Sequence, residues 1–362
     1  MADPTLSPEK NIASTSWLRA CLALFICLGL WLLLSAPRLE HSASASPDGL
    51  RRTAALSILR PVARFSEAIG LADATAAIQT AFGKDPDEPP GGELDLEEEL
   101  AGEELPPLPP QEIRPPVKIQ PPDQPRPDEK KADPQRSPRD TPLRRPSERY
   151  RLRVAVVGDS LAQGLGDAMR RTFRSSLVHV LDVGRLATGL ARADYFDWVD
   201  AMGKISRRYD PDVVVVMVGS NDKQSVVFPS GRTVVSGDPD WGAAYRQRIA
   251  DLLGATKQRA HIVWVGLPPV RDRGKSRLFR IYNDMYEAML QERRDARFVD
   301  IWDTFADSDG NYRAYGRGPD GKVVLLRAGD GAHFSVTGYD MIVDLALQVM
   351  QNRWDLTRKV LR

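Results

Sequence analysis

A serine, an asparagine and an Asp–His pair have the types and spacing that acyl transfer requires. Ser160 and Asn221 each follow a short apolar run, and Asp330 precedes His333 by three residues. A carboxylate can hold a histidine in one tautomer while the other ring nitrogen takes the proton of a serine hydroxyl. An asparagine amide can donate an uncharged hydrogen bond to a tetrahedral oxyanion. The pattern therefore predicts Ser160 as nucleophile, His333 as base, Asp330 as its orienting group and Asn221 as an oxyanion donor.

Each motif also has an ordinary structural interpretation. Ser160 and the preceding Asp159 are good helix N-cap residues, and Asn221-Asp222 is typical of a turn. A loop histidine such as His333 often has a purely structural partner. The combination of these residues along one alternating chain favours a catalytic site over unrelated turns.

The elements that must position this site alternate between strands and helices. Short apolar runs predict strands at 152–157, 177–183, 213–218, 262–265 and 297–301. Amphipathic patterns predict helices at 161–173, 193–209, 241–258, 278–293 and 336–351. This alternation is typical of an α/β domain whose parallel sheet is covered on both faces. Chemistry in such sheets takes place beyond the carboxyl ends of the strands, where Ser160 and Asn221 fall.

The order of the motifs resembles that of the GDSL/SGNH hydrolase family, from about residue 152 to the last helix. The first block is GDSL at 158–161, the third is GSND at 219–222, and the last is Asp330 to His333. The resemblance implies a three-layer, flavodoxin-like SGNH-hydrolase fold with a central parallel sheet. It also implies an ester hydrolase or acyl-transfer activity with Ser160 as the nucleophile and no cofactor.

The second block of the family supplies a glycine whose N–H binds the oxyanion, beside the N–H of Ser160 and the amide of Asn221. Here the sequence DVGRLATGL offers Gly184 or Gly189. Gly189 is favoured because Thr188 and Gly189 lead into the next helix, as the family's small-residue–Gly pair does. More narrowly, the ATGL, GSND and DGAHFSVTG motifs resemble the membrane-anchored bacterial branch of periplasmic SGNH proteins.

The part of the chain before this domain has a different composition. From Ala20 to Ala36 it carries no charge and is rich in leucine, which is typical of a membrane-spanning helix. We expect an uncleaved single-pass anchor in a bacterial inner membrane with the catalytic domain in the periplasm, although signal-peptide cleavage is an alternative. The predicted segments are a tail at 1–16, a signal-anchor at 17–37, amphipathic helices at 38–83, a linker at 84–148, the hydrolase domain at 149–356 and a tail at 357–362.

Two of these segments leave alternatives open. In 38–83, Pro61 predicts a break between two short helices, which form either a juxtamembrane stalk or helices on the bilayer surface. The linker at 84–148 combines an acidic block with more than half of the 28 prolines, so we predict disorder. We interpret it as a spacer, with docking of an envelope partner on its PxxP patterns as the alternative.

Two stretches fit no element of the sheet and its helices, and both lie close to the predicted site in the sequence. Residues 223–239 follow Asn221 as a loop or short hairpin, and 303–330 lead into Asp330 with a hairpin turn at 319–321. Arg232, Trp241 and Tyr312 in or beside them are candidate substrate-binding residues for a glycan. Packing of the loops by these side chains is an equally good interpretation.

Composition excludes several other functions. A formal net charge of +1 argues against a general nucleic-acid binder. The two cysteines, Cys21 and Cys27, both lie in the apolar run, which excludes a disulfide framework and a cysteine-based zinc site. The predicted function is an envelope serine esterase that removes acetyl or other small acyl groups from a polysaccharide or peptidoglycan. The alternatives are an O-acyltransferase that uses the same serine and a tethered scaffold that binds glycan without catalysis.

Overall fold

The structure is a computed structural model, and it describes residues 16–45, 50–68, 92, 94–100, 105–108, 143–257, 259–291, 293–354, 356, 360 and 361. The chain divides into two compact units, Met1–Pro90 and Gly91–Arg362. The second unit contains the sheet and all the predicted site residues.

A five-stranded parallel sheet forms the centre of the second unit. Its strand order is β2-β1-β3-β6-β7, with bounds β1 Leu152–Gly158, β2 Val178–Asp182, β3 Val213–Met217, β6 His261–Val265 and β7 Ala296–Val299. Every residue of β1, β3 and β6 is buried, which explains why their sequences are apolar without alternation. The predicted α/β fold with a central parallel sheet is confirmed.

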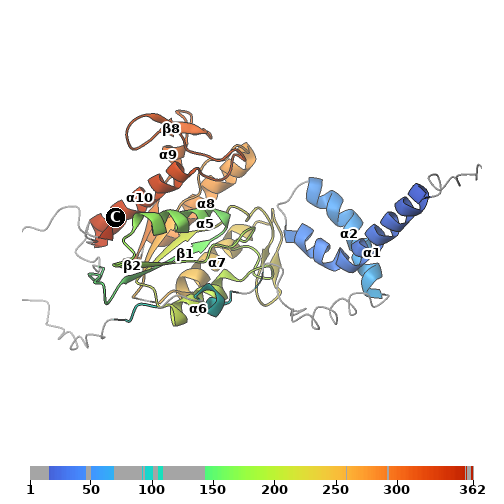
Figure 1. Cartoon of the computed structure of the whole chain (residues 1–362), viewed down its shortest axis with the longest axis horizontal. Coiled ribbons are helices and arrows are strands. Elements are labelled where there is room, and N and C mark those ends of the chain that lie inside the picture. The colour runs from blue at the N-terminus through green and yellow to red at the C-terminus, as the bar shows by residue number, and fades with distance from the viewer. Residues whose placement is uncertain are drawn as a thin grey trace, which may run out of the picture. The chain divides into compact units, whose positions relative to one another are not determined.

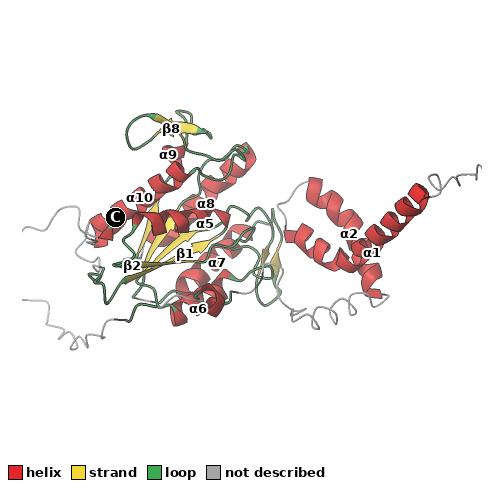
Figure 2. Cartoon of the chain, in the orientation of Figure 1, coloured by secondary structure: helices red, strands yellow, loops and turns green. Residues whose placement is uncertain are grey.

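Helices cover both faces of this sheet. Figures 1 and 2 show α5 and α10 on one side and α6 and α7 on the other. The remaining long helix, α8, packs against α7 and β7. The bounds are α5 Ser160–Thr172, α6 Trp198–Arg208, α7 Trp241–Ala255, α8 Arg273–Gln291 and α10 Val336–Trp354. The site residues therefore lie where β1 and β3 end and where α10 begins.

Two helix starts differ from the prediction. Helix α6 begins at Trp198 instead of 193, because the Asp197 side chain caps it by accepting a hydrogen bond from Val199 N at 3.0 Å. Helix α8 begins at Arg273 instead of 278, so its first turn is basic and polar. A short helix, α9 (Trp302–Phe305), was not predicted.

Both predicted hairpins are present. Strands β4 (Val226–Val227) and β5 (Thr233–Val234) pair antiparallel, as do β8 (Tyr315–Arg317) and β9 (Val323–Leu325). In the second hairpin, Gly321 N donates to Gly318 O at 2.9 Å and closes the predicted turn. Each hairpin extends a loop at the edge of the sheet where the site residues lie.

Part of the predicted linker packs on the second unit, so the prediction of disorder throughout 84–148 is wrong. The described residues 94–100 and 105–108, here called the docked segment, include a short helix, α4 (Leu96–Glu99). Leu94, Leu96 and Leu100 are buried in the common hydrophobic core. Glu97 pairs with Arg208 and Glu99 with Arg185, each at 2.7 Å. The leucines of this segment thus supply apolar contacts and its glutamates supply ion pairs, which the average composition of the linker does not indicate.

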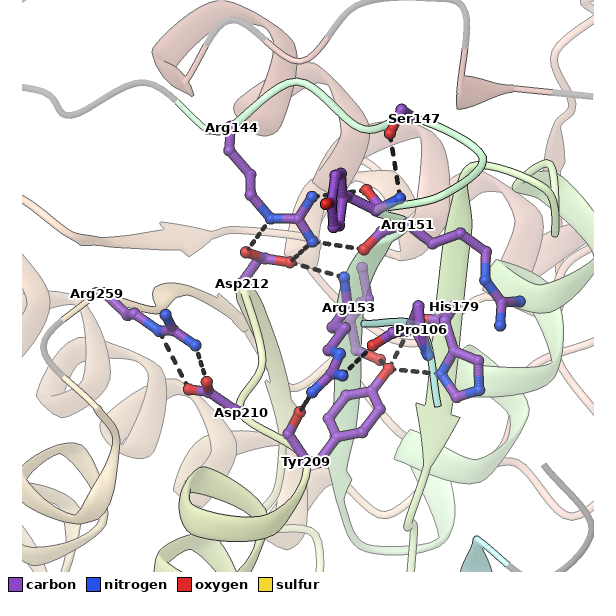
Figure 3. Close-up of polar contacts among 12 residues, drawn as sticks. Pro106, Arg144, Ser147, Arg151, Arg153, His179, Tyr209, Asp210, Asp212 and Arg259 are labelled. Atoms are coloured by element: carbon purple, nitrogen blue, oxygen red, sulfur yellow. Dashed lines mark hydrogen bonds and ion pairs between the residues drawn. The ribbon is translucent and has the colours of Figure 1, made fainter. Parts of the chain in front are cut away.

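The amino ends of the strands carry a polar network (Figure 3). Arg144 pairs with Asp212 through two hydrogen bonds of 2.7 and 2.6 Å, and Asp212 also accepts from Arg153 N at 2.8 Å. The buried Arg153 side chain donates to Tyr209 O and to Pro106 O of the docked segment. Residue 144 also falls within the predicted linker, so the folded unit begins before the predicted boundary at 149. Towards the carboxyl terminus of the chain, Val360 of the predicted tail accepts a hydrogen bond at its backbone oxygen from Arg174 N at 2.8 Å.

The first unit consists of two helices that pack together, α1 (Ser16–Ala45) and α2 (Leu50–Ala68). Helix α2 passes through Pro61, so the predicted break there is wrong. Pro61 lies on the exposed side, whereas Leu56 and Ala63 are buried on either side of it, so packing maintains the helix despite one lost hydrogen bond. Residues 69–83 lie outside the described residues.

Within the described part of the chain, no helix has the length and apolar character needed to cross a membrane. The predicted signal-anchor at 17–37 is not confirmed.

Candidate active site

The turn between β1 and α5 places Ser160 at the start of a helix. Gly158 has φ +142°, and a Cβ there would lie 1.9 Å from Met217 O, so only glycine allows β1 to end this close to β3. Asp159 caps the helix by accepting from Leu161 N at 3.0 Å. Ser160 is the first helical residue, where the helix dipole favours a developing negative charge. The capping interpretation therefore applies to Asp159 and leaves the Ser160 hydroxyl available.

The structure brings Ser160, His333 and Asp330 together in one hydrogen-bonded chain. His333 Nε2 lies 2.8 Å from Ser160 Oγ, and His333 Nδ1 lies 2.5 Å from Asp330 Oδ2. The side chains of His333 and Asp330 are 38% and 49% exposed, so an ester can reach them from solvent. With Nδ1–H donating to Asp330, Nε2 is the acceptor that can take the serine proton.

Hydrogen bonds keep Asp330 ionised. Desolvation raises the pKa of this carboxyl, but bonds from the backbone N–H groups of Ala332 and His333 and from the imidazole outweigh it, and the pKa is held at about 2. The two backbone bonds are 2.8 and 3.0 Å long. Asp330 is therefore a permanent anion at neutral pH, as an orienting group must be.

A buried arginine holds the loop that carries the base. Arg327 is completely buried and donates from Nη1 to Pro269 O at 2.5 Å and from Nη2 to Ala332 O at 2.6 Å. Its Nε donates to His333 O at 3.2 Å. Burial lowers its pKa to about 10, which still leaves it protonated at neutral pH. Arg327 was not predicted as a site residue, because nothing in a single sequence separates it from the exposed arginines around it.

The predicted oxyanion donors also lie together. Asn221 Nδ2 donates to Thr188 O at 3.0 Å, so the asparagine amide lies against the residue that precedes Gly189. One hydrogen of that amide remains for an oxyanion. Gly184 N is occupied by a bond to Asp182 Oδ1 at 3.2 Å, whereas no hydrogen bond of Gly189 N is recorded among the described residues. This difference favours Gly189 over Gly184.

Two buried aspartates join the loops of the site. Asp159 accepts from Gly219 N at 3.1 Å and Ser220 N at 2.8 Å, which links the nucleophile turn to the block of Asn221. Asp222 accepts from Leu190 N and Ala191 N, each at 2.9 Å, which links that block to the loop of Gly189.

Burial raises the pKa of both carboxyls, and that of Asp159 reaches about 6. A Cβ on Gly189 would lie 2.0 Å from Asp222 Oδ1, so glycine is required at that approach. The second residue of GDSL and the last of GSND are thus structural supports of the oxyanion site.

The three candidate substrate-binding residues lie in different surroundings. Trp241 stacks on Tyr245, with ring centroids 4.9 Å apart, and its Nε1 donates to Gln224 O at 2.7 Å, so it packs the first hairpin down. The Arg232 guanidinium lies 3.8 Å from the centroid of the Phe228 ring. Tyr312 lines a cavity of about 750 Å³ beside the catalytic loop. Arg232 lines a separate cavity of about 380 Å³, whereas the cavity of Tyr312 meets the turn of Asp330 through Arg271.

Among the described residues, no group of three or more histidine, cysteine, aspartate or glutamate side chains is placed to hold a metal ion.

The chain matches the protein family described as "Protein of unknown function (DUF459)" over residues 153–349. No curated protein matches it. Its fold is similar to that of a member of the lipolytic protein G-D-S-L family from Veillonella parvula, with 15% identity, TM-score 0.37, and coverage of 55% of this chain and 97% of that one. A carbohydrate esterase family 3 structure from Talaromyces cellulolyticus has 13% identity, TM-score 0.34, and coverage of 57% and 100%. The C-terminal catalytic domain of peptidoglycan O-acetyltransferase A from Streptococcus pneumoniae has 12% identity, TM-score 0.35, and coverage of 56% and 95%.

The family match covers more than half of the chain and contains all the site residues. The serine, glycine, asparagine and histidine blocks predicted from the motifs meet at one edge of the sheet. The chain therefore belongs to the family described as "Protein of unknown function (DUF459)", and the matched region carries the motif blocks of the GDSL/SGNH type.

Proposed function

We propose that this protein cleaves small acyl esters on a glycan of the bacterial envelope through an acyl-enzyme on Ser160. The observation that carries the proposal is the hydrogen-bonded chain from Ser160 Oγ through His333 to Asp330. This arrangement supplies a nucleophile, a base and a fixed counter-charge, which are the parts that ester cleavage by serine needs.

The reaction proceeds in two halves. Ser160 Oγ attacks the ester carbonyl and passes its proton to His333 Nε2, while the N–H groups of Ser160 and Gly189 and the amide of Asn221 bind the oxyanion. The intermediate then expels the sugar alkoxide, which takes the proton from His333, and leaves the acyl group on Ser160. Water repeats these steps, with His333 as its base, and releases the carboxylic acid.

Hydrolysis and transfer differ in which hydroxyl attacks the acyl-enzyme. The exposure of His333 and Asp330 gives water access to the site, and this favours hydrolysis. An O-acyltransferase would pass the acyl group to a glycan hydroxyl instead. To distinguish the two reactions, nitrophenyl acetate is supplied with and without an acetyl-free glycan, and the released acetate and the acetylated glycan are both measured.

The decisive test is substitution of the proposed nucleophile. Ser160→Ala should lower ester hydrolysis by at least about 10⁴-fold while the melting temperature stays near that of the wild type. A serine-directed phosphonate should modify Ser160 alone, as mass spectrometry of the labelled protein can show. Undiminished hydrolysis by the Ala variant, or labelling at another residue, would remove Ser160 from the mechanism.

The placement of the enzyme is a proposal from the sequence alone. The apolar run at 20–36 supports an inner-membrane anchor with the catalytic domain in the periplasm. A reporter enzyme that is active only in an oxidising compartment, fused after Glu148, should be active in a bacterial host. A silent but intact fusion would place the domain in the cytoplasm.

A further inference from the structure

A cavity of about 750 Å³ lies beside the loop of Asp330, and four of its twelve lining residues are arginines. Arg271 precedes α8, and Arg273, Arg277 and Arg280 are spaced along its first turns so that they share one helical face. Trp302 and Tyr312 line it as well. The cavity is large enough for one or more sugar units, since ligand sites of this kind are about 300–1,000 Å³.

The cavity shares a wall with the turn that carries Asp330. Arg271 N donates to Gly331 O at 3.0 Å, and Arg271 Nη1 donates to Gly329 O at 3.1 Å. Gly331 has φ +79°, and a Cβ there would lie 2.7 Å from Arg271 Cβ. A molecule in the cavity therefore lies next to the loop that carries Asp330.

The lining has an excess of positive charge. Its four arginines face two aspartates, Asp307 and Asp309. Asp307 Oδ1 already accepts from the backbone N–H groups of Asp309 at 3.0 Å and Asn311 at 2.8 Å. Within the described residues, no ion pair is recorded for the three arginines of α8. The side chains therefore retain donors for an external anion, and Arg is well suited to a carboxylate or phosphate.

Aromatic rings hold two of these guanidinium groups in place. The Arg280 guanidinium lies 4.1 Å from the centroid of the Trp302 ring, and that of Arg271 lies 5.5 Å from the centroid of Tyr312. The Tyr312 hydroxyl is buried and makes no hydrogen bond in the structure. This hydroxyl is enclosed by protein, so other atoms of Tyr312 line the cavity.

We propose that this arginine cavity binds a carboxylate or phosphate group of the same glycan that presents its ester to Ser160, so that the substrate is an acidic acylated glycan. The inference rests on the proposed function, because it names the substrate class of that site. Arg273 and Arg277 recognise the anion, and Arg271 connects the bound chain to the turn of Asp330.

The first experiment compares substrates. The values of kcat/KM are measured on an acetylated oligogalacturonide and on an acetylated xylo-oligosaccharide of equal length. Wild-type protein should prefer the acidic ester, and Arg273→Gln with Arg277→Gln should reduce that preference roughly 10- to 100-fold. Arg294→Gln, an exposed arginine after the other end of α8, is the matched control and should keep the preference. An equal rate on both esters in the wild type would overturn the proposal.

The second experiment measures binding without catalysis. Trigalacturonate, a glycerol phosphate oligomer and neutral xylotriose are titrated calorimetrically into the full chain. Binding of either anion, weakened by salt and by the double arginine variant, supports the proposal, and the tighter of the two identifies carboxylate or phosphate as the source.

Failure to bind either anion more tightly than xylotriose would contradict the arginine cavity, whatever the protein does with esters. Failure of the proposed function is seen separately, because the phosphonate would then not label Ser160 even if the anions bind.

Discussion

Two buried arginines, one at each end of the sheet, show how the same side chain can serve different purposes. At the amino ends of the strands, Arg153 donates to Tyr209 O at 2.5 Å and to Pro106 O (Figure 3). At the carboxyl ends, Arg327 donates to Pro269 O, Ala332 O and His333 O. Arg153 joins segments at the end of the sheet away from Ser160, whereas Arg327 fixes the backbone of His333.

The histidines near these arginines differ in the same way. His179 is buried, and its Nδ1 lies 2.8 Å from the Tyr209 hydroxyl, which is bonded in turn to backbone carbonyls. His333 is partly exposed and lies between a carboxylate and a serine. Exposure and hydrogen-bond partners decide whether a histidine can act as a base. The amino ends of the strands therefore form a closed network, here called the closed end, whereas the carboxyl ends are accessible to a substrate and are called the open end.

The largest effect expected at the open end, after loss of the nucleophile, is that of Asn221→Ala. The amide of Asn221 strengthens its bond only as charge develops on the ester oxygen, so kcat should fall roughly 100- to 1,000-fold with little change in KM. Steady-state kinetics on nitrophenyl acetate measures this. Covalent labelling of Ser160 should still occur, but more slowly.

Asn221→Asp is the matched variant, because it keeps the shape of the side chain and replaces the donor by a negative charge. It should be as damaging as alanine or worse. If Asn221 only closes a turn, the alanine variant would instead lose about 1 kcal/mol of stability and turn over substrate at the wild-type rate. Melting temperature and kcat measured on one preparation distinguish these results.

A paired substitution of the two arginines tests the comparison directly. Arg327→Met and Arg153→Met should each lower the free energy of unfolding by about 1–3 kcal/mol, because buried carbonyls lose their donors. Only Arg327→Met should also lower kcat, by roughly 10- to 100-fold, since the loop of His333 loses its backbone support. Urea unfolding and kinetics on folded protein give both quantities.

Equal loss of kcat in the two variants would show that both arginines support the whole domain alike. Arg327 would then have no special effect on the loop of His333. Unchanged kcat in Arg327→Met would show that the catalytic loop is held by other contacts.

The sheet and the proximity of Ser160, Asp330 and His333 were predictable because each has a local signal. The apolar runs of β1, β3 and β6 mark buried strands, and the spacing of Asp330 and His333 places two side chains on one turn. The supporting groups had no such signal. Arg327 and Arg271 look like any surface arginine in the sequence, because their partners are backbone carbonyls, which carry no sequence signal, and Pro269 and Gly329 lie 58 residues from them.

The docked segment shows a second limit of prediction from composition. A window rich in glutamate and proline has too few apolar residues to form a core of its own. Leu94, Leu96 and Leu100 nevertheless pack into the core of a domain that begins some fifty positions later. Windowed composition is insensitive to this kind of contact, because the stabilising partner lies outside the window.

The docked segment reaches the amino end through Pro106 and the loop after β2 through Glu99, but its leucines lie in the core. We therefore expect loss of the leucines to lower stability and leave kcat unchanged. Leu96→Ser with Leu100→Ser should lower the free energy of unfolding by about 3 kcal/mol, because the buried apolar surface of two leucines is lost. Leu108→Ser is the matched control in the same segment, because Leu108 is 39% exposed. Thermal unfolding and kcat on nitrophenyl acetate are the measurements. A fall in kcat without a fall in melting temperature would assign the segment to the open end instead.

The smallest expected effect concerns Asp182, at the carboxyl end of β2. Burial raises its pKa to about 6, and this outweighs the Gly184 N–H bond and the charge of Arg170, which lower it. Asp167 and Glu99 of the docked segment raise it further.

The ordinary pKa of an aspartate, 3.8, applies to the unfolded chain. Because the folded value is higher, the stability that Asp182 contributes is fully present below pH 3.8 and is lost as the pH rises through about 6. Asp182→Asn keeps an oxygen acceptor for Gly184 N–H but cannot ionise. The melting temperature of the variant should therefore rise relative to wild type between pH 4 and pH 8, by the equivalent of about 1–2 kcal/mol. If the melting temperatures of the two proteins change with pH in the same way across that range, Asp182 is solvated in the folded state and contributes no pH dependence to stability.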